Sequence, residues 1–310
     1  MRDQPQFKAY AALAAVCVVW GTTYLGIRMA LESFPPLLLI CLRYTISGAL
    51  LIAAAGLYGA HIPRGRELAR TAATGILLLG VGNGCLVFAE QWVPSGMAAL
   101  FVTTSPFWMV GIEAAAPRGE RLHAPTIAGM LVGLLGVALL VTPAGWRAGL
   151  HGQLAGGFLL LQLGCAGWAA GSITQRRHAT QTHPVVAGAV QQLVTGLLYL
   201  PLWLLFSGPS GAWKTRSVLA VLYLALSGSI VGYSAYLYAL HRLPVAVVSL
   251  YTYVNPTVAV LLGWLFYREP FGARAAAAMA IIFCGVAVVK RFGHSGGESH
   301  PRQAGASSGA

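Results

Sequence analysis

The sequence predicts an all-α integral membrane protein whose ten transmembrane helices form two inverted five-helix repeats. Three observations predict this fold: the composition, the length of the apolar runs and an internal repeat. Hydrophobic residues make up 57% of the 310 residues and charged residues only 9%, so a soluble fold would lack polar surface. The apolar runs recur at about 20 residues, the length that crosses a hydrocarbon core of roughly 30 Å. Barrel strands need only about half that length, and backbone groups in lipid must bond within their own segment, so helices are predicted.

The predicted spans follow one another with short connections. They are residues 10–29, 36–57, 71–88, 94–116, 124–141, 153–173, 184–205, 217–240, 244–266 and 271–289. The first run follows Arg2 and Lys8 but is longer than the apolar part of a signal peptide, so it is expected to stay on the mature protein. Residues 1–9 are predicted to be a short N-terminal segment, and residues 292–310 a disordered tail rich in Gly, Ser and His.

An internal repeat relates residues 10–142 to residues 153–289. Matching positions are Trp20 and Trp168, Arg28 and Arg176, Pro36 and Pro184, Gly82 and Gly232, Asn83 and Tyr233, Pro94 and Pro244, Pro106 and Pro256, and Gly136 and Gly285. Each half holds five predicted spans, and because five is odd, the second half must enter the membrane in the opposite orientation. Inverted repeats of this kind are typical of secondary transporters.

The basic residues predict the orientation, because Lys and Arg favour cytoplasmic connections. One side of the membrane would receive thirteen of them: Arg2, Lys8, Arg64, Arg66, Arg70, Arg118, Arg121, Arg176, Arg177, Arg242, Lys290, Arg291 and Arg302. The other side would receive six: Arg28, Arg147, Lys214, Arg216, Arg268 and Arg274. Both termini are therefore predicted to be cytoplasmic. The net charge of +12 comes mainly from basic residues in the connections between spans. We therefore attribute it to the orientation of the chain in the membrane and expect no nucleic-acid partner.

Several stretches of the sequence resemble a known family. They are WGTTYLGIR (20–28), ESFPP (32–36), Arg43, VGN (81–83), AE (89–90), VPSG (93–96) and YTYVNP (251–256). These stretches are similar to the EamA-type permeases of the drug/metabolite transporter superfamily, over nearly the whole chain. The resemblance implies two inverted five-helix halves, both termini in the cytoplasm, and export of amino acids, related metabolites or toxic compounds.

The expected function is therefore secondary or facilitated transport, in the export direction, of a small metabolite such as an amino acid or a drug-like amphipathic compound. The expected localisation is the inner membrane, and the expected partners are lipid and a small-molecule solute. The sequence leaves open whether the protein forms a homodimer. No phosphate-binding loop occurs among the three lysines, so ATP hydrolysis by this chain is not expected. A membrane-embedded enzyme and a non-transporting receptor are the alternatives.

The alternatives lack the residues that they would need. No Asp lies in a predicted span, and the histidines fall at helix ends, in connections or in the tail, so no catalytic or metal site is expected. All cysteines lie in apolar runs without CxxC spacing, which indicates small hydrophobic side chains. No cofactor is expected either.

Polar and aromatic residues near the middle of the spans are the candidates for solute binding. Two mid-membrane amides, Asn83 and Asn255, need partners that lipid cannot supply. The full candidate set is Trp20, Tyr24, Asn83, Ser105, Tyr233, Tyr236, Tyr251 and Asn255. An aromatic cavity with a few amides and hydroxyls suits an amphipathic solute, although such aromatics also serve as packing or interface anchors.

Two prolines at matching positions, Pro106 and Pro256, are expected to break their helices near the membrane midplane. They would leave the carbonyls of Val102 and Thr252 without helical partners. Broken helices at this depth commonly hold the solute in inverted-repeat transporters, and a simple packing kink is the alternative.

Charge inside the spans is scarce, so each charged residue there is a functional candidate. Arg43 lies about two turns into the second span, and Glu90 lies near the outer end of the third. They are expected to pair, either as a site of proton or cation coupling or as a structural ion pair at the outer gate. Glu113, near the cytoplasmic end of the fourth span, is expected to neutralise Arg118 and Arg121.

Overall fold

The computed structural model describes residues 4–93, 95–117, 123–146, 151–177, 182–207, 212–267 and 272–292. Within these residues every regular element is a helix, which confirms the all-α prediction. Ten helical segments coincide with the ten predicted spans. Some of these spans are continuous helices, and others are divided by a break or by a π-helical turn.

The first half of the chain contains α1 (Gln4–Leu31), α2 (Pro36–Leu57), α3 (Gly65–Gly75), η1 (Ile76–Asn83), α4 (Gly84–Ala89), α5 (Ser95–Val102), α6 (Ser105–Ala115) and α7 (Ala124–Trp146). The second half contains α8 (His151–Arg177), α9 (Pro184–Phe206), α10 (Thr215–Tyr223), η2 (Leu224–Tyr233), α11 (Ser234–Leu240), α12 (Val245–Val248), α13 (Tyr251–Tyr267) and α14 (Ala273–Phe292). The order of elements is therefore the same in both halves.

Six helices of the described chain are long and apolar enough to cross a membrane. They are Gln6–Leu31, Pro36–Leu57, Gly65–Ala89, Ala155–Arg177, Pro184–Phe206 and Thr215–Leu240. Ala124–Gly136 and Ala276–Val289 are shorter apolar helices. The chain is thus a helical membrane protein with several spans.

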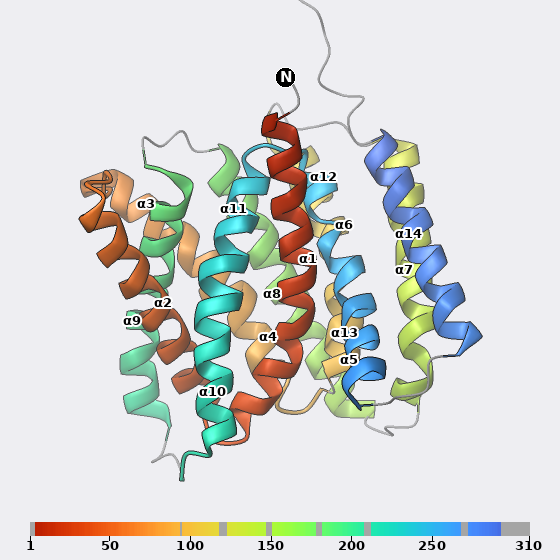
Figure 1. Ribbon diagram of the computed structural model, residues 1–310, viewed down its shortest axis with the longest axis horizontal. Coiled ribbons are helices and arrows are strands. Elements are labelled where there is room, and N and C mark those ends of the chain that lie inside the picture. The colour runs from red at the N-terminus through yellow and green to blue at the C-terminus, as the bar shows by residue number, and fades with distance from the viewer. Residues whose placement is uncertain are drawn as a thin grey trace, which may run out of the picture.

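The helices form one bundle in which matching elements of the two halves meet (Figure 1). α2 packs against α9 at one edge of the bundle, and α7 packs against α14 at the other. α1 packs against α10, η2 and α11, and α8 packs against η1 and α4, so each first helix contacts the third span of the opposite half. α1 begins and α14 ends on the same side of the bundle.

Glycines let α2 and α9 approach closely at matching positions. A Cβ atom at Gly48 would lie 2.7 Å from Leu193 Cα, and one at Gly196 would lie 2.5 Å from the backbone nitrogen of Thr45. Small residues permit such close contact between membrane helices. The two contacts mirror each other, because residues 45 and 48 correspond to residues 193 and 196 in the repeat.

Both π-helical segments, η1 and η2, lie in the middle of the third span of their half. The hydrogen-bond pattern of a π-helix differs from that of an α-helix, and π turns are frequent at functional sites. Side chains from other helices bond the backbone of these segments. Tyr199 donates to the Gly80 carbonyl at 2.8 Å, and Trp20 donates to the Gly228 carbonyl at 2.9 Å. Both π segments are therefore fixed by contacts with the opposite half.

The breaks in the fourth spans differ in place between the halves. In the first half α5 ends at Val102 and α6 begins at Ser105, directly before Pro106. In the second half the break falls at Ser249 and Leu250, and Pro256 lies inside α13. The predicted break at Pro106 therefore lies where expected, whereas the break expected at Pro256 lies six residues earlier.

The hydrogen bonds before Pro256 show how this proline fits within a helix. Thr252 N donates to the Ser249 carbonyl at 3.2 Å, and Tyr253 N donates to the Leu250 carbonyl at 3.1 Å. These bonds span three residues, so the first turn of α13 is wound more tightly than an α-helix. The helical hydrogen-bond pattern is therefore disrupted at the start of α13, several residues before Pro256.

Candidate functional site: a central cavity

A cavity of about 690 Å³, including its opening to solvent, lies between the two halves of the chain. Its walls come from α1, α2, η1, α4, α5 and α6 of the first half and from α8, η2 and α13 of the second. The lining residues are Trp20, Thr23, Tyr24, Arg43, Tyr44, Leu79, Gly82, Asn83, Leu86, Val102, Ser105, Leu161, Gly164, Cys165, Trp168, Gly228, Ser229, Tyr233, Tyr251 and Asn255. Both π segments and the broken fourth span contribute to it.

One wall of the cavity is a cluster of aromatic rings around Trp20. The Trp20 ring lies 5.3 Å from Trp168 and 5.0 Å from Tyr251, both in edge-to-face geometry, and 5.2 Å from Tyr236. These separations are in the favourable range for aromatic pairs. The cluster brings α1, α8, α11 and α13 together on one apolar surface.

Hydrogen bonds fix the orientation of the two tryptophans. Trp20 Nε1 donates to the Gly228 carbonyl, and Trp168 Nε1 donates to the Tyr236 hydroxyl at 3.1 Å. The same hydroxyl lies 2.6 Å from Ser172 Oγ. Both indole N–H groups therefore have acceptors within the protein, and neither needs a water molecule as a hydrogen-bond partner.

Asn255 anchors the cavity on α13. With its amide oriented so that the nitrogen donates, Asn255 bonds the carbonyls of Cys17 and Tyr251, both at 3.0 Å. The hydroxyl of Tyr24 also lies against this side chain. The amide thus ties α13 to α1 and meets the need for partners that the sequence predicted.

Arg43 is the one described cation among the lining residues, and it is 5% exposed. Its Nε donates to Ser229 Oγ at 2.8 Å, and its Nη1 donates to Asn83 Oδ1 at 3.3 Å. Arg43 therefore connects α2 to both π segments, since Asn83 ends η1 and Ser229 lies in η2. Its guanidinium also lies 5.1 Å from the centre of the Tyr44 ring.

Arg43 and Glu90 do not form the ion pair that the sequence predicted, within the residues that the structure describes. Glu90 follows Ala89, the last residue of its span, and is buried, and neither of its carboxylate oxygens has a hydrogen-bond partner. Burial raises the pKa of this carboxyl group well above its usual range, although Arg28 and Arg43 oppose the shift. The two charges are separate because Arg43 turns toward η1 and η2.

A second polar chain leads from the cavity wall toward the end of α11. The Tyr233 hydroxyl donates to Gln191 Oε1 at 2.7 Å, Gln191 donates to Gln175, and the Gln175 amide lies 3.5 Å from His241 Nε2. His241 follows the last residue of its span, and burial lowers its pKa, as do the charges of Arg242 and Arg176. These buried amides are satisfied by one another.

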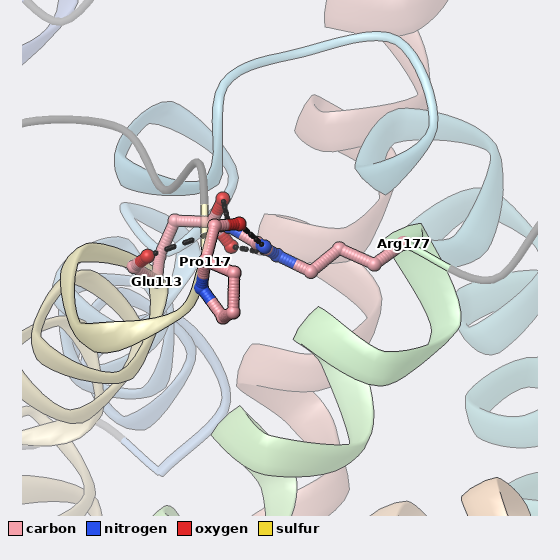
Figure 2. A network of polar contacts seen from close by, with 3 residues as sticks. All are labelled: Glu113, Pro117 and Arg177. Carbon is pink, nitrogen blue, oxygen red and sulfur yellow. Dashed lines mark hydrogen bonds and ion pairs between the residues drawn. The ribbon is translucent and has the colours of Figure 1, made fainter.

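An ion pair joins α6 to α8. Arg177 Nη2 lies 2.7 Å from Glu113 Oε1, and Arg177 Nε lies 3.4 Å from Glu113 Oε2. Figure 2 shows that Arg177 also reaches the carbonyl of Pro117, at 2.6 Å from Nη1. The sequence pointed to Arg118 and Arg121 as partners of Glu113, and these lie outside the described residues.

The structure brings most of the predicted site together. Every predicted solute-binding residue except Tyr236 lines the cavity. Tyr236 lies behind the lining residue Trp168 and accepts a hydrogen bond from its indole nitrogen. Arg43 lines the cavity, whereas Glu90, Pro106 and Pro256 do not. That these residues bind a solute stays a prediction.

Sequence reasoning missed Trp168, Tyr44, Cys165 and Ser229, all of which line the cavity. The repeat offered a signal for Trp168, because it matches Trp20. Cys165 accepts a hydrogen bond from Ser105 Oγ at 3.1 Å, a contact that no local pattern indicates. Within the described residues no group of three or more His, Cys, Asp or Glu side chains could hold a metal ion.

The fold and the cavity define a class of protein: helical membrane proteins that enclose a central cavity between two halves of the same element order. A model of the EamA-like transporter family matches residues 7–142 and again residues 155–291. The chain therefore belongs to the EamA-like transporter family.

Similar proteins agree with this assignment. The chain is 36% identical over 268 residues to the uncharacterized inner membrane transporter YedA of Escherichia coli (strain K12), covering 85% of this chain and 84% of that protein. It is 26% identical over 293 residues to a probable terminal-alkyne amino-acid exporter of Streptantibioticus cattleyicolor, covering 92% and 94%. A solved crystal structure has a TM-score of 0.77 and 27% identity, covering 91% of this chain and 96% of that one.

Proposed function

We propose that this protein is a secondary or facilitated transporter that exports a small amphipathic metabolite through the central cavity. The observation that carries the proposal is the cavity itself, which is built from elements of both halves, including the matching pairs α1 and α8, η1 and η2, and α6 and α13, and is lined by aromatic rings, amides and hydroxyls. Sites with an apolar wall and a few placed polar groups suit small ligands. The printed names of the relatives support transport, and one of them names an amino-acid exporter.

We further propose that the halves are inverted repeats with both termini in the cytoplasm of an inner-membrane protein. Three reciprocal contacts support the repeat: Gly48 with Leu193 mirrors Gly196 with Thr45, Gly82 with Trp168 mirrors Gly232 with Trp20, and Gly136 with Ile282 mirrors Gly285 with Gly133. Inverted repeats supply inward-open and outward-open states of similar energy. A periplasm-active reporter that works when fused after Ala310 would contradict the orientation.

Glu90 is the proposed coupling residue. Its buried carboxyl group without a hydrogen-bond partner can exchange a proton when the outer side of the bundle opens to water. Glu90→Gln is then expected to keep solute binding but lose the response of flux to a pH gradient. An unchanged response in a folded Glu90→Gln protein would end the coupling proposal while leaving transport itself intact.

Flux into proteoliposomes tests the main proposal. Purified protein is expected to accelerate the uptake of at least one member of a panel of amino acids and amphipathic acids, amides and amines above that of protein-free vesicles. Arg216→Gln is a suitable control, because Arg216 is exposed at the start of α10 and away from the cavity. No acceleration by folded protein with any compound of the panel would contradict the transporter assignment of this site.

A further inference from the structure

We infer that Arg43 is the receptor for a carboxylate group of the solute, so that the transported compound is an organic acid with an apolar or aromatic body. This inference rests on the proposed transport function and specifies the substrate class of the same cavity. It departs from the expectation that Arg43 serves as a partner of Glu90.

The hydrogen bonds of Arg43 leave part of its guanidinium free. A guanidinium has five N–H donors, and Arg43 uses its Nε for Ser229 and Nη1 for Asn83. Nη2 has no hydrogen-bond acceptor among the described residues. A Cβ atom at Gly228 would lie 3.1 Å from Nη2, so a larger residue at this position would crowd Nη2, and Gly228 lets the guanidinium lie close to the backbone. Both Arg43 and Gly228 line the cavity.

The charge of Arg43 also lacks a partner in the described chain. Ser229 and Asn83 are neutral, and the described carboxylates of Glu32, Glu67 and Glu113 pair with other groups. Glu90 acts on Arg43 only at a distance. A buried cation without a counter-ion is costly at membrane depth, and such residues commonly mark the path of a charged substrate. A solute carboxylate would supply the missing charge.

A carboxylate fits this site better than a phosphate. Arg43 is the sole cation among the described lining residues, and its charge balances one negative charge. A phosphate monoester carries close to two negative charges at neutral pH, and the described lining offers no second cation for them. The planar fork of a guanidinium matches the geometry of a carboxylate.

The aromatic wall determines the rest of the solute. Trp20 Nε1 donates to the carbonyl of Gly228, and the guanidinium of Arg43 also lies beside Gly228. The edge of the Trp20 ring and the Arg43 guanidinium are therefore close to the same residue. Trp168 and Tyr251 pack against the Trp20 ring and extend this aromatic surface. An acid bound by Arg43 would therefore place its apolar body against these rings.

Binding of matched compounds to the purified protein tests the inference. The probes are 3-phenylpropionate, 3-phenylpropionamide, phenethylammonium, L-phenylalanine, phenylalaninamide, hexanoate, hexanamide and phenyl phosphate. Ligand-induced stabilisation gives each dissociation constant, since a ligand that binds only the folded state raises its apparent stability. Acids should bind roughly 10- to 100-fold more tightly than their amides, as expected for charge-assisted hydrogen bonds.

Three variants separate binding from structure. Arg43→Gln should remove the preference for acids over amides, Arg43→Lys should keep a weaker preference for acids, and the control Arg216→Gln should behave as wild type. Should Arg43→Gln fail to fold, the comparison of acid with amide on the wild-type protein still decides, because a buried carboxylate without a counter-ion is disfavoured.

Several outcomes would overturn the inference. They are equal binding of acid and amide, tighter binding of phenethylammonium or phenyl phosphate, no binding of any acid, or a preference for acids that survives in Arg43→Gln. Flux of an amide or amine in proteoliposomes together with any of these results would leave the transport function standing and refute only the role of Arg43.

Discussion

The ion pair between Glu113 and Arg177 provides a quantitative test of the packing between α6 and α8. The side chain of Glu113 is 8% exposed and that of Arg177 is 28% exposed. Breaking a fully buried pair by removing one partner costs about 3–5 kcal/mol, and exposure of Arg177 reduces this figure. We therefore expect Arg177→Gln to lower the free energy of unfolding by about 2 kcal/mol, because it leaves the Glu113 carboxylate buried alone.

The reverse change should be milder. Glu113→Gln leaves Arg177 in contact with the Pro117 carbonyl and partly in water, so we expect a loss of about 1 kcal/mol. The double variant should lose about 2 kcal/mol, less than the sum of the single changes, because no buried charge is left unpaired. Equilibrium unfolding by SDS titration in mixed micelles measures all of these free energies.

A second cycle serves as the control. Glu32 and Lys214 lie 3.6 Å apart, but their side chains are 36% and 64% exposed, so their coupling should be below about 0.5 kcal/mol. Additive effects of Glu113→Gln and Arg177→Gln, within about 0.5 kcal/mol, would refute the claim that this pair stabilises the contact between α6 and α8.

Three further predictions concern the cavity and the outer end of the third span. Asn83→Leu and Asn255→Leu should each abolish flux while the protein stays folded and inserted, and normal flux in both would remove the amides from the site. Tyr236→Phe should lower stability by about 1 kcal/mol, because the hydroxyl bonds Trp168 and Ser172 while the ring is kept; a neutral effect would show that water replaces these bonds. Wild type should lose stability as pH rises from about 4.3 through the raised pKa of Glu90, while Glu90→Gln should show no such loss; equal pH profiles of unfolding would contradict the burial of a titrating carboxyl group.

The fold could be predicted from the sequence because its signals are local. Apolar runs of membrane length predict spans, and α2 begins and ends at the predicted residues, Pro36 and Leu57. Pro36 favours a helix start, since its fixed φ and missing N–H suit the first turn. Eight of the twenty described residues that line the cavity could be predicted, because polar groups in mid-span need partners within the protein.

The remaining features depend on contacts between distant segments. The two π segments are bonded by Tyr199 and Trp20, which belong to other helices, so no local pattern indicates them. Arg43 turns toward Ser229, and Glu113 pairs with Arg177, because the fold brings these groups together. Pro256 fits within α13 because the preceding turn is wound more tightly. The proline alone does not determine whether the helix breaks or tightens at this point.

Blocking the cavity tests the central claim most directly. Val102 is half-buried and lines the cavity, so Val102→Trp should fill it, whereas Leu135 is 67% exposed on α7 and Leu135→Trp should leave it open. The measurement is flux of the acids and amides of the probe panel into proteoliposomes that contain equal amounts of folded protein. We predict flux with wild type and Leu135→Trp and none with Val102→Trp. Equal flux through the Val102→Trp protein would contradict passage of the solute through this cavity.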